Sequence, residues 1–130
     1  MSITHSATAR AAATDAVTNL LGSAAKLCFH ATGGSVAAPG AALATLPMTA
    51  AANGGFSTGG ATATAGTITS DTNSGAGTVA NFSLQTTGSV AVVYGAVAAS
   101  ASDINMSNGL ALTSGDTVSC SSLTYTALSA

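Results

Sequence analysis

Short runs of residues separated by turn-forming clusters dominate the chain after Gly22. The clusters contain glycine, asparagine, aspartate and serine, and many of the runs between them alternate large apolar with small or polar side chains. Glycine allows positive φ angles, and the side chains of Asn, Asp and Ser bond to the backbone in turns. Alternation with a period of two indicates strands that bury one face. Short strands that recur in this way are typical of a sandwich or barrel.

The strands are predicted from this alternation. The clearest pair is Thr78–Thr86 and Ser89–Val97, which Gly88 joins as a hairpin. The other predicted strands are Ala25–Thr32, Ala41–Met48 (with Pro47 at an edge or turn), Gly60–Ser70, Leu110–Thr113 and Thr117–Leu128. Turns or loops are predicted at Gly33–Gly34, Asn53–Gly55, Asp71–Gly77, Ser100–Asn108 and Ser114–Asp116.

One helix is predicted, over residues 5–21, because this stretch is rich in alanine, the best helix former. Thr4 or Ser6 is the expected N-cap, and Gly22 is the expected C-terminal stop. Helical spacing gathers apolar residues into one stripe, and Arg10, Asp15 and Asn19 are expected away from it. The stripe consists of Ala13, Ala16, Val17, Leu20 and Leu21.

The predicted fold is therefore mainly β, a small antiparallel β-sandwich or barrel-like domain of about six to eight strands with one N-terminal α-helix. Residues 1–24 form a helical arm, and residues 25–130 form a single β-sandwich domain. A chain of 130 residues has the length of one domain.

Charge is nearly absent: charged residues make up 5% of the chain, against about 25% in an ordinary domain. Two cations cannot neutralise a run of phosphates, so nucleic acid is not an expected partner. A cluster of Lys and Arg for an anionic membrane surface is lacking too, as is an apolar run long enough to span a bilayer. A surface with so little charge suits a protein that is docked in an assembly, although a surface of hydroxyls and amides is the alternative.

No catalytic, cofactor or metal site is predicted. Cys28 and Cys120 are expected to be small buried hydrophobes, although a disulfide between the first and last strands stays open. Cys28 and His30 share a strand face, and a further ligand from the last strand would be needed for a metal. The loop aspartates, Asp71, Asp103 and Asp116, are expected to stabilise turns. Calcium binding by DTNSG and ice binding by the alternating threonines of TATAGTIT are the minor alternatives.

Three segments carry a resemblance to known proteins: the helix opening THSATARAAATDAVTNLL, the segment ATAGTITSD and the end GDTVSCSSLTYTA. With these, nearly the whole chain resembles a family of short virion structural proteins of tailed phages and prophages. The resemblance implies a particle component such as a capsid decoration, or cement, protein. The chain departs from such relatives in one respect, because a charged residue often interrupts their strands.

The resemblance implies that the partners are the major capsid protein and neighbouring copies of the chain, and that the protein resides in the virion. The N-terminus does not look like a secretory signal, so assembly in the host cytoplasm is expected. The N-terminal segment is predicted to carry the interface, through Ile3, Val17, Leu20 and Leu21. Its stripe packs either on its own sheet or on a neighbour. A minor tail or neck component and a host-surface-binding module are the alternative functions.

Overall fold

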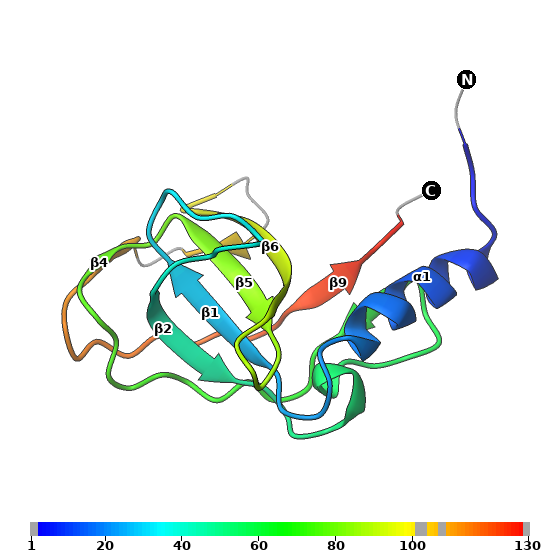
Figure 1. Cartoon of the computed structure of the whole chain (residues 1–130), viewed down its shortest axis with the longest axis horizontal. Helices are drawn as coiled ribbons and strands as arrows, with labels where there is room; N and C mark the ends of the chain where they lie inside the picture. The colour runs from blue at the N-terminus through cyan, green and yellow to red at the C-terminus, as the bar shows by residue number, and fades with distance from the viewer. Residues whose placement is uncertain (1–2, 101–103, 107–108, 129–130) are drawn as a thin grey trace.

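The computed structural model describes residues 3–100, 104–106 and 109–128. Its elements follow in the order α1 (Ala7–Asn19), β1 (Lys26–His30), β2 (Ala42–Pro47), the 3-10 turn η1 (Ala52–Gly55), β3 (Thr62–Thr64), β4 (Gly77–Thr78), β5 (Asn81–Gln85), β6 (Ala91–Ala98), β7 (Ile104–Asn105), β8 (Ala111–Leu112) and β9 (Thr124–Thr126). The molecule is elongated, with most strands at one end and α1 at the other (Figure 1). The expectation of a mainly β fold with an N-terminal helix is confirmed.

The main sheet has the order β2-β1-β5-β6-β7. The first four strands are antiparallel neighbours, and the short β7 pairs in parallel with the end of β6. Leu27 in β1 lies opposite Leu46 of β2 and Leu84 of β5, which forms a row of leucines across three strands. Their exposed fractions are 0–2%, so this row lies at the centre of the core.

The other face of the sheet is polar and yet buried. Cys28, His30 and Ser83 alternate with the core residues and are at most 1% exposed. The loop of residues 31–41 crosses this face (Figure 1). Gly34 is required there, because a Cβ atom would lie 2.5 Å from the Pro39 carbonyl oxygen and 3.0 Å from the Tyr94 hydroxyl. Burial on both faces therefore comes from a loop that folds back on the sheet.

Two small sheets complete the fold. β3 pairs with β9 and β4 pairs with β8, both antiparallel. α1 packs against η1 and β3. In Figure 1 β9 runs out of the β-rich end toward α1, so the last strand links the two ends of the molecule.

The predicted hairpin is confirmed as β5 and β6. The predicted strands that correspond to β1, β2 and β8 are also confirmed, and the bounds of these three agree within two residues at either end. The helix begins at Ala7 and ends at Asn19, with Ser6 as the N-cap, whose hydroxyl accepts a hydrogen bond from the Ala9 N–H at 3.1 Å. Gly22 follows with a φ of 74°, as a C-terminal stop requires. The predicted loop at residues 53–55 is instead part of η1, with Asn53 and Gly54 in the left-handed region.

Two long strands were predicted where the structure has short ones. In residues 60–70 only β3 is a strand, because the next residues change partners: Ala65 N–H donates to Leu123, Gly66 to Gly55 and Thr69 to Pro47. In residues 117–128 only β9 is a strand, preceded by an isolated bridge between Val118 and Asp71. The segment Thr78–Thr86 also divides, into β4 and β5. Part of the predicted loop 100–108 forms β7, and residues 101–103 and 107–108 lie outside the described residues.

Candidate docking surface

Threonine attaches α1 to the rest of the chain. The Thr14 hydroxyl, with 0% exposure, donates to the Ala61 carbonyl at 2.6 Å and accepts from the Ala127 N–H at 3.2 Å. One side chain thus joins the helix to the backbones that flank β3 and β9. The role of Thr14 could not be predicted from the sequence, because both partners are more than 40 residues away in the chain and nothing local marks it.

Other polar contacts strengthen this attachment. The Asp15 carboxylate accepts from the Gly59 N–H at 3.1 Å. The Asn53 side-chain amide donates to the Thr18 hydroxyl at 3.0 Å and to the Asp15 carbonyl at 3.2 Å. Thr18 is 1% exposed. The inner face of α1 is therefore largely polar, and hydrogen bonds hold it as much as apolar packing does.

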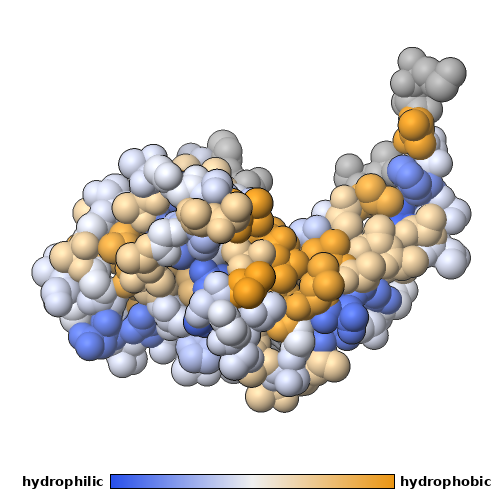
Figure 2. All heavy atoms as spheres, viewed as in Figure 1, coloured by the Kyte–Doolittle hydropathy of each residue, from blue (hydrophilic) through white to orange (hydrophobic). Residues whose placement is uncertain are grey.

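The outer face of α1 carries exposed apolar residues next to the exposed Thr8 and Asn19. Ala12, Ala16 and Leu20, spaced four residues apart, are exposed, and the exposed fraction of Leu20 is 63%. Figure 2 shows apolar residues along this end of the molecule and in the region between it and the β-rich end. The predicted single stripe is wrong, because threonines occupy the inner face of the helix. The Thr14 hydroxyl bonds there to the backbone of Ala61 and Ala127, and the Thr18 hydroxyl accepts from the Asn53 side-chain amide. Leu21 is buried, and Ala16 and Leu20 are outside.

The four predicted interface residues are therefore divided. Ile3 and Leu20 are exposed, Ile3 at 75%. Val17 is half-buried, and Leu21 is 1% exposed within the protein's own core, beside Gly54. Ile3 and Leu20 are thus free to meet a partner, whereas Leu21 is already packed against its own chain. Val36 and Val90 are the other large hydrophobic residues that are exposed in the described chain.

Two of the three loop aspartates stabilise turns, and the prediction is confirmed for these two. Asp71 accepts from the Asn73 N–H at 2.8 Å and from the Thr45 N–H at 2.9 Å. Asp116 accepts from the Thr113 N–H at 2.8 Å. Asp103 lies outside the described residues. These carboxylates bond to backbone donors, which accounts for their position in loops without a ligand.

A buried polar cluster joins β1, β5 and the loop of residues 31–41. His30 Nδ1 lies 3.1 Å from the Ala41 carbonyl oxygen, which only accepts, so Nδ1 carries the proton. Nε2 lies 2.7 Å from the Ser83 hydroxyl oxygen, and that oxygen accepts from the Gln85 amide at 2.9 Å. The three side chains are at most 5% exposed. An imidazole beside a serine hydroxyl is thus present, but both are closed off from any substrate in this structure.

Ser83→Ala is expected to lower the free energy of unfolding by about 1–3 kcal/mol, because it removes a buried partner from both His30 and Gln85. Urea denaturation followed by circular dichroism measures the change. Ser23→Ala, at an exposed serine, is the control and should change stability by less than about 0.5 kcal/mol. Equal effects of the two substitutions would show that the cluster contributes nothing.

Both cysteines are free thiols. The prediction of burial is confirmed for Cys28, at 1% exposure, whereas Cys120 is only half-buried. Burial raises the pKa of the Cys28 thiol, against a weaker lowering by the Thr45 hydrogen bond. Burial also raises the pKa of the Cys120 thiol, which donates to the Ser122 carbonyl at 3.3 Å. Among residues 3–100, 104–106 and 109–128, no three His, Cys, Asp or Glu side chains are grouped to hold a metal.

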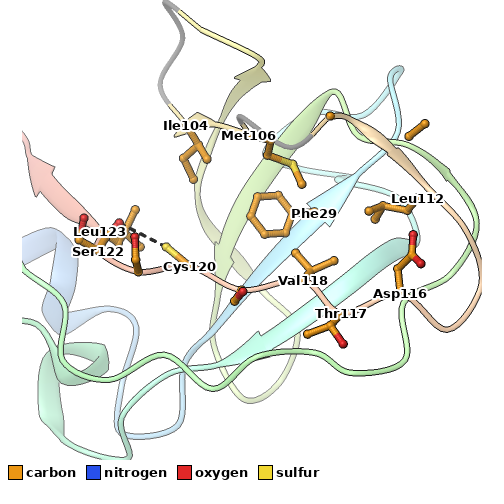
Figure 3. Close-up of a pocket in the computed structure, with 14 residues that line it drawn as sticks. Phe29, Ile104, Met106, Leu112, Asp116, Thr117, Val118, Cys120, Ser122 and Leu123 are labelled. Carbon is orange, nitrogen blue, oxygen red and sulfur yellow. Dashed lines mark hydrogen bonds between the residues drawn. The ribbon is translucent and has the colours of Figure 1, made fainter.

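A cleft of about 750 Å³ lies where the C-terminal segment crosses the core face of the sheet. Figure 3 shows the Phe29 ring in this cleft, between Met106 and Val118. Serines and threonines of residues 117–122 form part of its lining. Its ionisable groups, Asp116 and Cys120, are at opposite ends (Figure 3), so they do not form an acid–base pair.

Comparisons with known proteins returned no matching family model, curated protein or solved structure. Within the described part of the chain, α1 and the other helical segment are too short and too polar to cross a bilayer. The candidate docking surface consists of the exposed apolar residues on the outer side of α1, Ala12 and Ala16, together with Leu20 at its C-cap.

Proposed function

We propose that this chain is a non-enzymatic structural protein of a tailed-phage particle, and that it decorates the assembled head as a cement protein. It binds the major capsid protein and stabilises the shell, with neighbouring copies close by. The protein is assembled in the host cytoplasm and resides in the virion. The observation that carries the proposal is the group of exposed apolar residues on the outer side of α1 and at its C-cap: Ala12, Ala16 and Leu20.

Three features support this function. Exposed apolar residues that gather on one side of a protein mark interaction sites, and Ala12, Ala16 and Leu20 gather on the outer side of α1. The chain has only two cations and four anions to keep free copies apart. The resemblance of the helix opening and of the C-terminal segment to virion proteins points to the same class. A cement protein needs affinity and many copies rather than catalysis, because its stabilising effect depends on occupancy of the assembled shell.

Leu20→Asp is expected to weaken binding to heads assembled without this protein by at least about tenfold. Burying a leucine contributes about 1.5–3 kcal/mol, and 1.4 kcal/mol corresponds to a factor of ten. Sedimentation of heads with increasing amounts of purified protein measures the affinity and the number of sites. The wild-type protein should bind saturably, in proportion to the number of capsid subunits.

Val36→Asp is the matched control, because it places the same charge at another exposed hydrophobic residue, in the loop of residues 31–41. It should bind heads as the wild type does. Undiminished binding of Leu20→Asp would exclude the outer face of α1 as the docking surface. Failure of the wild-type protein to bind heads at all would contradict the decoration role.

A further inference from the structure

The side-chain amide of Asn53 holds the C-terminal half of α1 against η1. Its nitrogen donates to the Thr18 hydroxyl at 3.0 Å and to the Asp15 carbonyl at 3.2 Å, so both N–H donors of the amide are used. Thr18 is 1% exposed and Asn53 is half-buried, which places these bonds largely away from solvent. The residue at position 53 therefore has to supply N–H donors.

The backbone at position 53 restricts the choice of residue further. Asn53 has a φ of 59° and a ψ of 30°, in the left-handed region, where asparagine is enriched relative to most other residues. Glycine would adopt this conformation but has no side-chain donor, and aspartate would adopt it without an N–H. Asparagine meets both requirements.

The next residue has to be glycine, for an independent reason. Gly54 has a φ of 63°, and a Cβ atom there would lie 2.9 Å from Leu21 Cδ1 and 3.2 Å from Ala25 Cβ. Gly54 is buried, and its N–H donates to the Gly22 carbonyl at 2.7 Å. Two separate requirements of the fold thus place an asparagine directly before a glycine at the point where α1 is attached.

An asparagine before a glycine loses its side-chain amide readily, because glycine has no Cβ to hinder the backbone nitrogen that attacks. The Gly54 nitrogen forms a bond to Cγ of Asn53, and the Cγ–Nδ2 bond breaks. The proton of the Gly54 N–H leaves with the amide as ammonia. Water then opens the cyclic imide at either carbonyl, which yields aspartate or isoaspartate, and no oxidant or reductant is needed.

The folded structure blocks this reaction at both reacting groups. The Gly54 N–H that would attack is bonded to the Gly22 carbonyl. The amide that would leave is bonded to α1, through Thr18 and the Asp15 carbonyl. These bonds have to break before the nitrogen reaches Cγ, so the reaction requires α1 to separate from η1. Proteins open locally in this way at a lower free energy than that of global unfolding.

We propose that Asn53 is a site of spontaneous deamidation that reacts when α1 opens, and that the product keeps α1 from closing again. Aspartate at position 53 has no N–H for the Asp15 carbonyl, and it places a negative charge beside that oxygen. Isoaspartate also adds a methylene group to the main chain next to Gly54, which packs closely on Leu21. The modification is thus a one-way release of α1, and it concerns the chain alone, whichever partner α1 binds.

The rate of deamidation at residue 53 tests the route. Full-length protein is incubated at mildly alkaline pH, and mass spectrometry of proteolytic peptides measures the conversion of Asn53. The wild type should react at least about tenfold more slowly in buffer than in urea. Thr14→Val removes the hydroxyl that bonds α1 to Ala61 and Ala127, so it should react at least about tenfold faster than the wild type in buffer.

Ser83→Ala is the control for this rate, because it weakens the main sheet and leaves the hydrogen bonds of α1 in place. It should react as the wild type does. Equal acceleration by Ser83→Ala and Thr14→Val would assign the reaction to global unfolding and overturn the inference. A residue 53 that stays unreacted in urea, or that reacts as fast in buffer as in urea, would do the same.

Hydrogen exchange of the α1 backbone tests the release. Asn53→Asp reproduces one product, and its α1 amides should exchange at least about tenfold faster than those of the wild type. Asn73→Asp makes the same change at an exposed asparagine and should exchange as the wild type does. Wild-type protein that has reacted at residue 53 during storage, isolated by ion exchange, should resemble Asn53→Asp, and this measurement holds even if the variant fails to fold. Wild-type exchange of α1 in the reacted protein would overturn the release.

Discussion

Leu27→Ala is expected to lower the free energy of unfolding by about 2–5 kcal/mol, the range for removing a buried leucine side chain. Leu27 is 0% exposed and lies between Leu46 and Leu84 in the row of leucines that crosses three strands. Neighbours on both sides are fixed by strand pairing, so the cavity cannot close easily. Because small domains are stable by about 5–15 kcal/mol, a large part of the stability should be lost.

Urea denaturation measures this change, and Leu20→Ala is its matched control. The same side chain is removed there from a position that is 63% exposed, so the expected loss is below about 0.5 kcal/mol. Similar midpoints for the two variants would show that the core is not centred on β1.

Thr14→Val is expected to lower the free energy of unfolding by about 2–5 kcal/mol. Valine keeps the shape of threonine but removes the hydroxyl, so the Ala61 carbonyl and the Ala127 N–H both lose their partner. Each backbone group left without a partner away from water costs about 1–3 kcal/mol. The end of the molecule that contains α1, β3 and β9 should loosen first.

Thr8→Val is the control, because it makes the same change at an exposed position of the same helix. The two variants share any effect of helix propensity, so their difference isolates the hydroxyl of Thr14. Denaturation midpoints that agree within error would remove Thr14 from the account of how α1 is attached.

The parts of the fold that could be predicted are those that local pattern determines. The β5–β6 hairpin has large alternating residues and Gly88 at its turn, and β1 alternates Leu27 and Phe29 with Cys28 and His30. The Ser6 cap and Gly22 are likewise local signals. In each case the alternation of side chains along a strand, or the residue at a cap or turn, favours a single local conformation.

The parts that could not be predicted depend on distant partners. Residues 60–70 alternate threonine with small residues, and such a pattern does not specify which strand they pair with. The rotation of α1 depends on Ala61 and Ala127, far along the chain from Thr14. The burial of His30 and Ser83 depends on a loop that folds over the sheet, which only the tertiary structure shows.

The candidate docking surface likewise has a part that the sequence predicts and a part that depends on the tertiary structure. Scarcity of charge and the exposed Ile3 and Leu20 agree with an N-terminal interface, which stays a prediction until a partner is bound. Leu21 was assigned to the interface on helical spacing alone, and spacing cannot distinguish an inner from an outer face when threonine takes the inner one.

The measurement that tests the central claim most directly is the copy number of this protein in purified phage particles, relative to the major capsid protein. Quantitative mass spectrometry with labelled peptides of both proteins provides it. The account predicts a simple whole-number ratio of the two, as expected for a protein that occupies equivalent sites over the head. Absence of the protein from the particle, or a copy number that matches a single ring at the neck or tail, would contradict the decoration role.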